Sequence, residues 1–273
     1  MKPAGLFGWV VFASAALGAQ PDVAALVKRS VANHDRAVRE QTQWRYKQID
    51  TTHSGGEKHV ETSEVIPLFG TPYERLIAKD GRPLSPEEQK IEERKYEKAF
   101  EKRQKESPAE RAARIKKYHG QWSFLADLPA AYEFKLLGEE AVEGRPAWII
   151  GMTPRAGFVP STSRGSMLRH ISGKLWLDKH DVQWAKAEAH VINMIEIGWV
   201  LARVGPGAEI RMDMTRVAEG LWMPASIDIN GSAKVLMVHH KNLNEQLKFS
   251  DFARVGRDQA VQVTGNHPPK QVR

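Results

Sequence analysis

The first regular pattern in the chain is an apolar stripe that predicts one amphipathic helix over residues 22–41. Apolar side chains recur there at three- and four-residue spacing, and the charged residues between them would face water. Asp22 precedes the stripe and is placed to cap the helix. His34 falls on the stripe, and we interpret it as a histidine at the edge of the core rather than as a ligand. The stripe consists of Val23, Leu26, Val27, Val31, His34 and Val38.

Most of the remaining chain alternates between apolar and polar residues in short runs that predict β-strands. Turn dipeptides such as Asp80-Gly81 and Asn230-Gly231 separate many of these runs. Because strands joined by a tight turn cannot be parallel, the runs predict an antiparallel meander. The expected strands cover residues 44–51, 58–66, 73–79, 134–142, 145–153, 174–179, 182–192, 195–204, 208–216, 221–229, 232–240 and 246–253.

Residues 85–118 break this pattern and predict two consecutive charged helices. Ser85 and Ser107 each precede a proline and stand three residues before a glutamate, which is the arrangement of a capping box. Of the 33 residues from Ser85 to Lys117, 19 are charged, so these helices can bury only a narrow apolar stripe. Two interpretations stay open: a solvated helical arm, or a surface that docks a partner.

Together these patterns predict an α+β fold. Several strands carry apolar residues on one face only, as where Ile210, Met212 and Met214 alternate with charged residues. A sheet of about ten strands with one apolar face should curl, so we expect a strongly curved antiparallel sheet that forms an incomplete barrel. The helix at 22–41 can cover its concave side, and the charged helices form an insertion at 85–118. An apolar cavity is expected between the sheet and its cover.

Composition and charge narrow the classes of protein. The 273 residues include 41% hydrophobic residues and no cysteine, and the formal charge is +7. This composition excludes a wholly disordered chain, a disulfide framework, a thiolate metal site and a cysteine nucleophile. The basic residues are scattered, with no basic stripe among aromatic residues, so no nucleic-acid partner is expected. Transient contact with an anionic membrane surface fits the modest excess of positive charge.

The beginning of the chain has the pattern of a secretory signal peptide. Lys2 precedes an apolar run from Leu6 to Leu17, and the small residues Gly18 and Ala19 follow. We expect cleavage after residue 18 or 19 and a periplasmic or otherwise secreted location; the alternative is an uncleaved anchor or a buried helix. The expected organisation is a signal peptide at 1–19, a single domain at 20–255 and a flexible tail at 256–273.

Catalytic signatures are missing from the sequence. It contains no Gly-x-Ser-x-Gly, no phosphate-binding glycine loop and no His-Glu-x-x-His. The histidines are dispersed, and the adjacent His239 and His240 would point to opposite faces of a strand. We therefore expect no enzymatic activity, no cofactor and no metal site; a hydrolase is the disfavoured alternative.

Tryptophan, methionine and aliphatic residues on the strands are the candidate walls of the cavity. Methionine adapts to ligands of differing shape, although any one of these residues alone would simply fill a core. Residues 154–172 lack periodicity and are expected to form a lid whose arginines meet head-group phosphates, or else a mobile surface loop. The wall candidates are Trp148, Ile150, Trp199, Ile210, Met212, Met214, Leu221, Met223 and Ile227, and the lid candidates are Phe158, Met167 and Leu168.

Three stretches of the chain carry a resemblance to a known family. Residues 138–150 (GEEAVEGRPAWII) form a glycine-turn hairpin that ends in an aromatic-aliphatic strand, and residues 173–178 (GKLWLD) and the long strand 182–192 follow. This order resembles the periplasmic lipoprotein-sorting proteins, the LolA-like and LppX-like lipid carriers, over about residues 20–255. The resemblance implies an incomplete antiparallel barrel, closed by helices around a hydrophobic cavity for acyl chains.

The expected function follows from the cavity and the resemblance. We expect an exported, non-catalytic carrier or binding protein whose partner is a lipid or an acylated protein. The alternative is an interaction or sensor module of the same fold, in which the charged helices at 85–118 dock another envelope protein.

Overall fold

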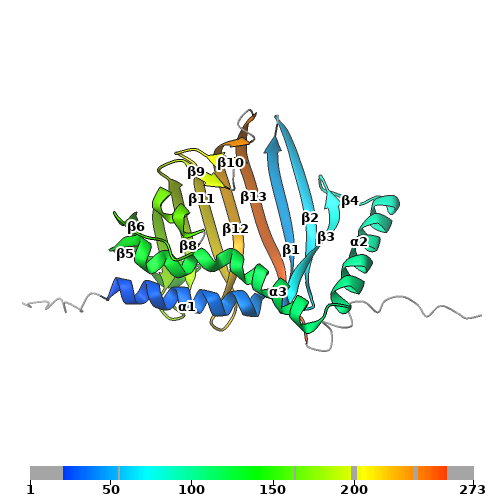
Figure 1. Cartoon of the computed structure of the whole chain (residues 1–273), viewed down its shortest axis with the longest axis horizontal. Helices are drawn as coiled ribbons and strands as arrows, with labels where there is room; N and C mark the ends of the chain where they lie inside the picture. The colour runs from blue at the N-terminus through cyan, green and yellow to red at the C-terminus, as the bar shows by residue number, and fades with distance from the viewer. Residues whose placement is uncertain (1–20, 55, 163, 198–201, 236–238, 257–273) are drawn as a thin grey trace, which may run out of the picture.

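The computed structural model describes residues 21–256, except 55, 163, 198–201 and 236–238 (Figure 1). The expected signal peptide, nearly all of the expected tail and Trp199 therefore lie outside the described residues. The helices are α1 (Val23–Gln41), α2 (Pro86–Gln104), α3 (Pro108–His119) and α4 (Leu128–Ala131), with 3₁₀ helices η1 (Gly120–Asp127) and η2 (Gly165–His170). The strands are β1 (Trp44–Ser54), β2 (Glu57–Leu68), β3 (Thr71–Lys79), β4 (Arg82–Pro83), β5 (Tyr132–Val142), β6 (Arg145–Pro154), β7 (Ile171–Asp178), β8 (Trp184–Val191), β9 (Ile195–Ile197), β10 (Ala202–Val204), β11 (Glu209–Ala218), β12 (Leu221–Val235) and β13 (His239–Arg254).

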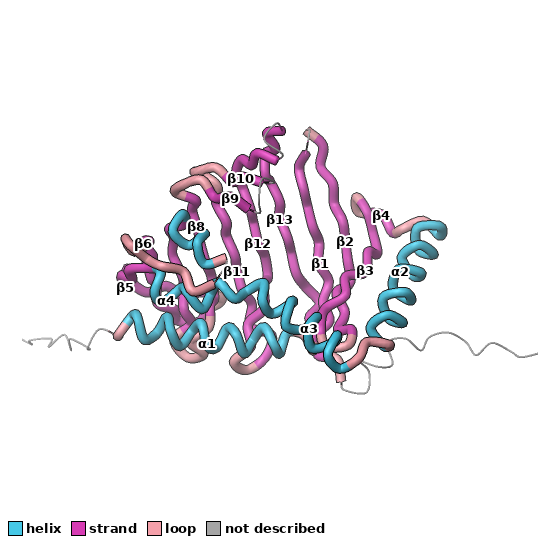
Figure 2. Tube along the Cα trace, viewed as in Figure 1, coloured by secondary structure: helices cyan, strands magenta, loops and turns pink. Residues whose placement is uncertain are grey.

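One antiparallel sheet forms the body of the molecule. Eleven of its thirteen described strands follow the order β4-β3-β2-β1-β13-β12-β11-β8-β7-β6-β5. The other two, β9 and β10, lie off this path, where β10 pairs with both β9 and β12. Among the described strands β4 and β5 end the order and do not pair with each other, so the barrel is open. The predicted α+β fold is confirmed: an unclosed antiparallel sheet with an N-terminal helix and a helical insertion (Figure 2).

The position of β13 differs from the predicted meander. This last strand lies in the middle of the sheet, between β1 and β12, and pairs Arg254 with Trp44 near the start of the domain. A second departure is the pairing of β8 with β11, which leaves out β9 and β10. The meander is therefore correct only within three runs of strands, β1 to β4, β5 to β8 and β11 to β13.

The predicted turn at Asn230-Gly231 is wrong. Both residues lie within β12, opposite Asn244 and Leu243 of β13. A Cβ atom on Gly231 would lie 2.5 Å from the Cβ of Ala208, so this glycine allows two backbones to approach closely rather than turning the chain. The two strands expected at 221–229 and 232–240 are thus the single strand β12 and the beginning of β13, and the strand expected at 195–204 is the pair β9 and β10.

The amphipathic helix α1 forms as predicted. The carboxylate of Asp22 accepts a hydrogen bond of 3.0 Å from the backbone N–H of Ala25 and caps the helix. The buried face of α1 includes Val27, which is fully buried in the main hydrophobic cluster together with residues of the sheet. α1 therefore covers one side of the sheet, along its lower edge in Figure 1.

The helical insertion begins with the two predicted capping boxes. Ser85 and Ser107 each accept a hydrogen bond from the backbone of the glutamate three residues later, and that glutamate bonds back to the serine. α2 is nevertheless more than a solvated arm, because Tyr96 is buried against Ile66 and Leu68 of β2. Figure 1 shows α2 standing beside β3 and α3 leading back toward α1.

Candidate functional site on the inner face of the sheet

The pairing register determines which side chains share a face of the sheet. Residues directly opposite each other on paired strands point to the same side. Ten strands thereby contribute one residue each to a continuous row, which we call the central row. Across the sheet, the central row consists of Leu136, Ile150, Leu175, Ala187, Met212, Ile227, Leu247, Asp50, Glu61 and Lys79.

The first half of the central row belongs to the core beneath α1. Ile150 and Leu175 are almost completely buried in the same cluster as Val27 of α1. Ala187 and Met212 pack against this cluster from the next two strands. The central row therefore lies on the inner face of the sheet, which is the face that α1 covers.

The middle of the inner face is apolar and only partly covered. Its residues come from β11, β12 and β13 and are half-buried, and in Figure 1 the helices cross the lower part of these strands rather than their upper part. The neighbouring row on the same face adds Ile210 and Ile229, which lie opposite each other. We call this set the apolar strip, and it consists of Ile210, Met212, Ile227, Ile229 and Leu247.

The apolar strip ends at three carboxylates, which we call the acidic group. Asp50 lies opposite Leu247 on one side and opposite Glu61 on the other, and Glu245 lies opposite Ile229. Burial raises the pKa of Asp50, and the charge of Glu61 raises it further. Burial and the charge of Asp50 likewise raise the pKa of Glu245. The inner face therefore changes from apolar to acidic between β13 and β2.

The structure places the wall candidates in three environments. Ile210, Met212 and Ile227 lie together in the apolar strip. Trp148 and Ile150 belong to the core beneath α1. Trp199 lies outside the described residues. The others are buried near the turn between β11 and β12, and they are Met214, Leu221 and Met223. The sequence reasoning missed Ile229, Leu247 and the acidic group, which only the register brings onto this face.

The three lid candidates are packed into the molecule. Phe158 and Leu168 are buried in the main cluster, and Met167 packs against it. The stretch between Phe158 and Met167 is held by Asp127. Its buried carboxylate accepts hydrogen bonds of 3.0 Å from the backbone N–H groups of Ser161 and of Thr162 and further bonds from both hydroxyls.

The hydrogen bonds on Asp127 keep it ionised. Burial alone would raise the pKa of this carboxyl, but the bonds from Ser161 and Thr162 outweigh burial and lower it. A buried charge that accepts four hydrogen bonds fixes the loop geometry strongly. The segment thus combines buried residues, such as Phe158 and Leu168, with exposed ones, such as Arg155 and Val159.

We expect Asp127→Asn to release this segment. The amide would turn an N–H₂ donor toward N–H donors of the loop, and we expect a loss of about 2–3 kcal/mol in local stability because hydrogen bonds to charged groups are replaced by a mismatch. Hydrogen–deuterium exchange of peptides covering residues 155–164 should accelerate. Ser161→Ala, which removes only one hydroxyl, should have a smaller effect; equal protection in wild type and Asp127→Asn would contradict the assignment.

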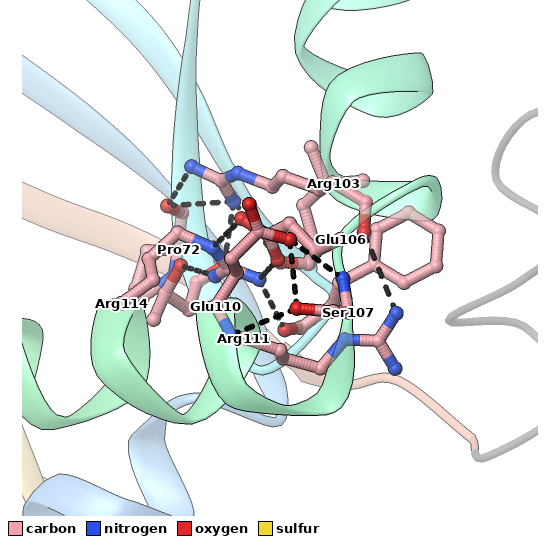
Figure 3. A network of polar contacts seen from close by, with 10 residues as sticks. Pro72, Arg103, Glu106, Ser107, Glu110, Arg111 and Arg114 are labelled. Carbon is pink, nitrogen blue, oxygen red and sulfur yellow. Dashed lines mark hydrogen bonds and ion pairs between the residues drawn. The ribbon is translucent and has the colours of Figure 1, made fainter.

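A polar network fixes the helical insertion to the sheet. Arg103 of α2 donates hydrogen bonds to the carbonyl oxygens of Leu68, Thr71 and Pro72, at 3.0 to 3.4 Å. Arg114 of α3 pairs with Glu106 through two hydrogen bonds of 2.6 and 2.7 Å and also donates to the hydroxyl of Thr71 at 2.6 Å (Figure 3). The two helices are thus held in a defined position, with the charged outer face of α2 exposed.

Two other kinds of feature, metal-binding clusters and membrane-spanning helices, are not found in the described part of the chain. Within residues 21–256, apart from the gaps given above, no cluster of three or more metal-binding side chains is found. No helix in this part is both long enough and apolar enough to span a membrane. The inner face itself presents apolar surface beside negative charge.

Comparisons with known proteins identify distant structural likenesses. No protein-family model and no curated protein matches the chain. Among solved structures, a LolA superfamily protein from Nitrosomonas europaea is 11% identical, with 84% of this chain and 93% of that chain covered and a TM-score of 0.34. A putative outer membrane lipoprotein-sorting protein domain from Vibrio parahaemolyticus is 10% identical, with 87% and 98% covered and a TM-score of 0.33.

A third likeness is to MucB. The MucA/MucB complex from Pseudomonas aeruginosa is matched at 11% identity, with 84% of this chain and 99% of that chain covered and a TM-score of 0.22. The chain thus has distant structural similarity to LolA superfamily, lipoprotein-sorting and MucB proteins.

Proposed function

We propose that this chain is an exported, non-catalytic protein that binds acyl chains of a lipid or a lipidated protein on the inner face of its sheet. The observation that carries the proposal is the continuity of the central row. Its apolar side chains run from the filled core beneath α1 to the half-buried Ile227 and Leu247, without a polar residue between them. Export is proposed from the signal-peptide pattern at residues 1–19.

Burial of apolar surface supplies the binding energy in this proposal. Each CH₂ group removed from water contributes roughly 0.8 kcal/mol, so an acyl chain laid along the apolar strip binds without any reacting group. Because β4 and β5 do not pair, no closed ring of hydrogen bonds holds the described sheet at a fixed width. A ligand can therefore be accommodated by a change in the curvature of the sheet.

Native mass spectrometry of protein purified from an exporting bacterial host tests this function. Wild type should carry adducts of lipid mass. Ile227→Asp should lose most of them, because a charge in the apolar strip must be desolvated when the chain binds. The matched control is Asn230→Asp, which introduces the same charge on the same strand but on the opposite face.

A milder variant protects this test against misfolding. Ile227→Thr keeps the β-branched shape and should reduce the lipid load only partly. Variants are compared only when their circular dichroism and melting temperatures match wild type. Wild-type protein that stays free of lipid after incubation with phospholipid vesicles would contradict the proposed function.

A second candidate function rests on the helical insertion. The network around Arg103 and Arg114 holds α2 firmly, although its outer face carries exposed charges such as Lys98 and Lys102. The same helix also carries exposed acids such as Glu101, so this surface fits the docking of a charged envelope protein. A photo-crosslinker placed at residue 98 should then give one specific adduct that Lys102→Glu abolishes, whereas lipid binding should be unaffected; no adduct, or the same adduct with Lys102→Glu, counts against docking.

A further inference from the structure

A pocket of about 560 Å³ opens at the surface beside the lid segment. Residues 154–159 and Arg169 form it. Its inner wall is Phe158, which is buried in the main cluster, whereas Val159 beside it is 80% exposed. A residue of the main hydrophobic cluster therefore forms part of the wall of this surface pocket.

Two arginines of this pocket have hydrogen-bonding capacity to spare. Arg169 donates to the carbonyl oxygen of Phe158 through Nε at 3.0 Å and through Nη2 at 2.7 Å. Arg155 donates to the carbonyl oxygen of Tyr132 at 3.1 Å. Both side chains contact only carbonyl oxygens and an aromatic ring among the described residues, and a guanidinium has five N–H donors. Several donors of each arginine therefore stay free for a ligand.

The residues that line the pocket include two arginines and no carboxylate. Residues 154–177 contain three arginines and one lysine but no aspartate or glutamate. Asp127, which contacts this segment, is buried and occupied by the hydrogen bonds from Ser161 and Thr162. In a protein with many exposed ion pairs, two exposed arginines without a carboxylate in one pocket form a positive site.

Exposed aliphatic side chains lie next to the same segment. The backbone N–H of Ile192 donates to the carbonyl oxygen of His170, which follows Arg169, at a distance of 2.8 Å. Ile192 and Met194 are 44% and 43% exposed. Two exposed aliphatic side chains therefore lie near the residue that follows Arg169, outside the lining of the pocket.

We propose that this pocket binds the phosphate head group of a single-chain or lipid-like amphiphile, with Arg155 and Arg169 as its donors. Guanidinium groups match the geometry of phosphate oxygens, and the apolar wall accepts the first carbons of the attached chain. This inference rests on the proposed function, because the chain of the same ligand would continue onto the inner face. It adds a head-group preference that the apolar strip cannot provide.

The test compares ligands that differ only in the head group. Fluorescence titrations of the full chain use lysophosphatidic acid below its critical micelle concentration, a monoacylglycerol with the same acyl chain, and inorganic phosphate alone. Wild type should bind lysophosphatidic acid at least tenfold more tightly than the monoacylglycerol. This preference should weaken as salt is raised, because exposed charges are screened.

Variants locate the preference in the pocket. Arg155→Gln/Arg169→Gln should remove the preference and leave affinity for the monoacylglycerol unchanged. Arg155→Gln alone loses one hydrogen bond to Tyr132 and should remove part of the head-group preference. This single variant controls for damage to the loop caused by the change at Arg169. Arg164→Gln is the matched control, because Arg164 lies on the same segment but outside the pocket.

The outcomes distinguish a failure of the proposed phosphate site from a failure of the proposed acyl-chain binding. Equal affinity for both amphiphiles, or a preference that Arg164→Gln removes as effectively, overturns the phosphate site while acyl binding stands. A third outcome is that the protein binds inorganic phosphate but neither amphiphile, and that Arg155→Gln/Arg169→Gln weakens phosphate binding. That result identifies a site for free phosphate and overturns the proposal of an amphiphile. No binding of any of the three probes overturns both proposals.

Discussion

Arg145→Ala should lower the free energy of unfolding by about 2–3 kcal/mol, because it leaves the carboxylate of Asp178 buried without its cation. Asp178 has no exposed surface, and Arg145 pairs with it through two hydrogen bonds of 2.7 and 2.9 Å. The backbone N–H groups of His180 and Asp181 also donate to Asp178, and these donors keep the loss below that of a fully isolated charge. Urea denaturation at pH 7 measures the effect.

The control for this prediction is an exposed ion pair. Lys105 lies 3.8 Å from Glu101, and both side chains are largely exposed, so Lys105→Ala should change stability by no more than about 0.5 kcal/mol.

Burial raises the pKa of Asp178, but the bonds from Arg145 and the backbone outweigh it and lower that pKa. The difference between wild type and Arg145→Ala should therefore shrink as the pH falls below the usual aspartate value of about 4. If Arg145→Ala changes the free energy of unfolding at pH 7 no more than Lys105→Ala does, the stabilising role of the Arg145–Asp178 pair is refuted.

The stability of the protein should fall between pH 6.5 and about pH 4 because of His34. Burial lowers the pKa of His34 from 6.5 to about 4, against a smaller opposing effect of Asp35. In this range the unfolded chain binds a proton that the folded chain does not, so acid favours unfolding. The maximum loss is roughly 3 kcal/mol, since each pKa unit corresponds to about 1.4 kcal/mol.

The surroundings of His34 explain why it stays neutral. Its ring stacks on Trp184 at 4.8 Å and meets the edge of Trp122 at 6.1 Å. Its Nε2 atom is buried and has no hydrogen-bond partner among the described residues. Denaturation midpoints measured from pH 7.5 to pH 4 should show a smaller slope for His34→Phe than for wild type. A wild-type slope in His34→Phe would exclude His34 as the cause.

The helices were predictable because their signals are local. Asp22, Ser85 and Ser107 each cap a helix within three residues of themselves, so a short stretch of sequence contains the whole interaction.

The burial of two tryptophans was not predictable by alternation. Trp184 and Trp222 would face water in regular strands, but register shifts beside both residues disturb the alternation, and both side chains are buried.

The candidate site was only partly predictable for a related reason. Ile210, Met212 and Ile227 could be found because β11 and β12 are adjacent in sequence and alternate regularly. The acidic group could not, because Asp50 and Glu245 come onto one face only through the pairing of β1 with β13. Nothing within the stretch around Asp50 indicates that a distant strand places it beside Leu247.

The central position of β13 also has a consequence for how the chain matures. Since β13 joins β1 to β12, the two halves of the sheet stay separate until residues 239–254 are available. Contacts between segments about 200 residues apart form slowly, and meanwhile β1 and β12 present bare edges that can pair with other chains. Truncation before β13 should therefore produce aggregation rather than a smaller soluble protein, and a chaperone that shields these edges would raise the yield of the folded form.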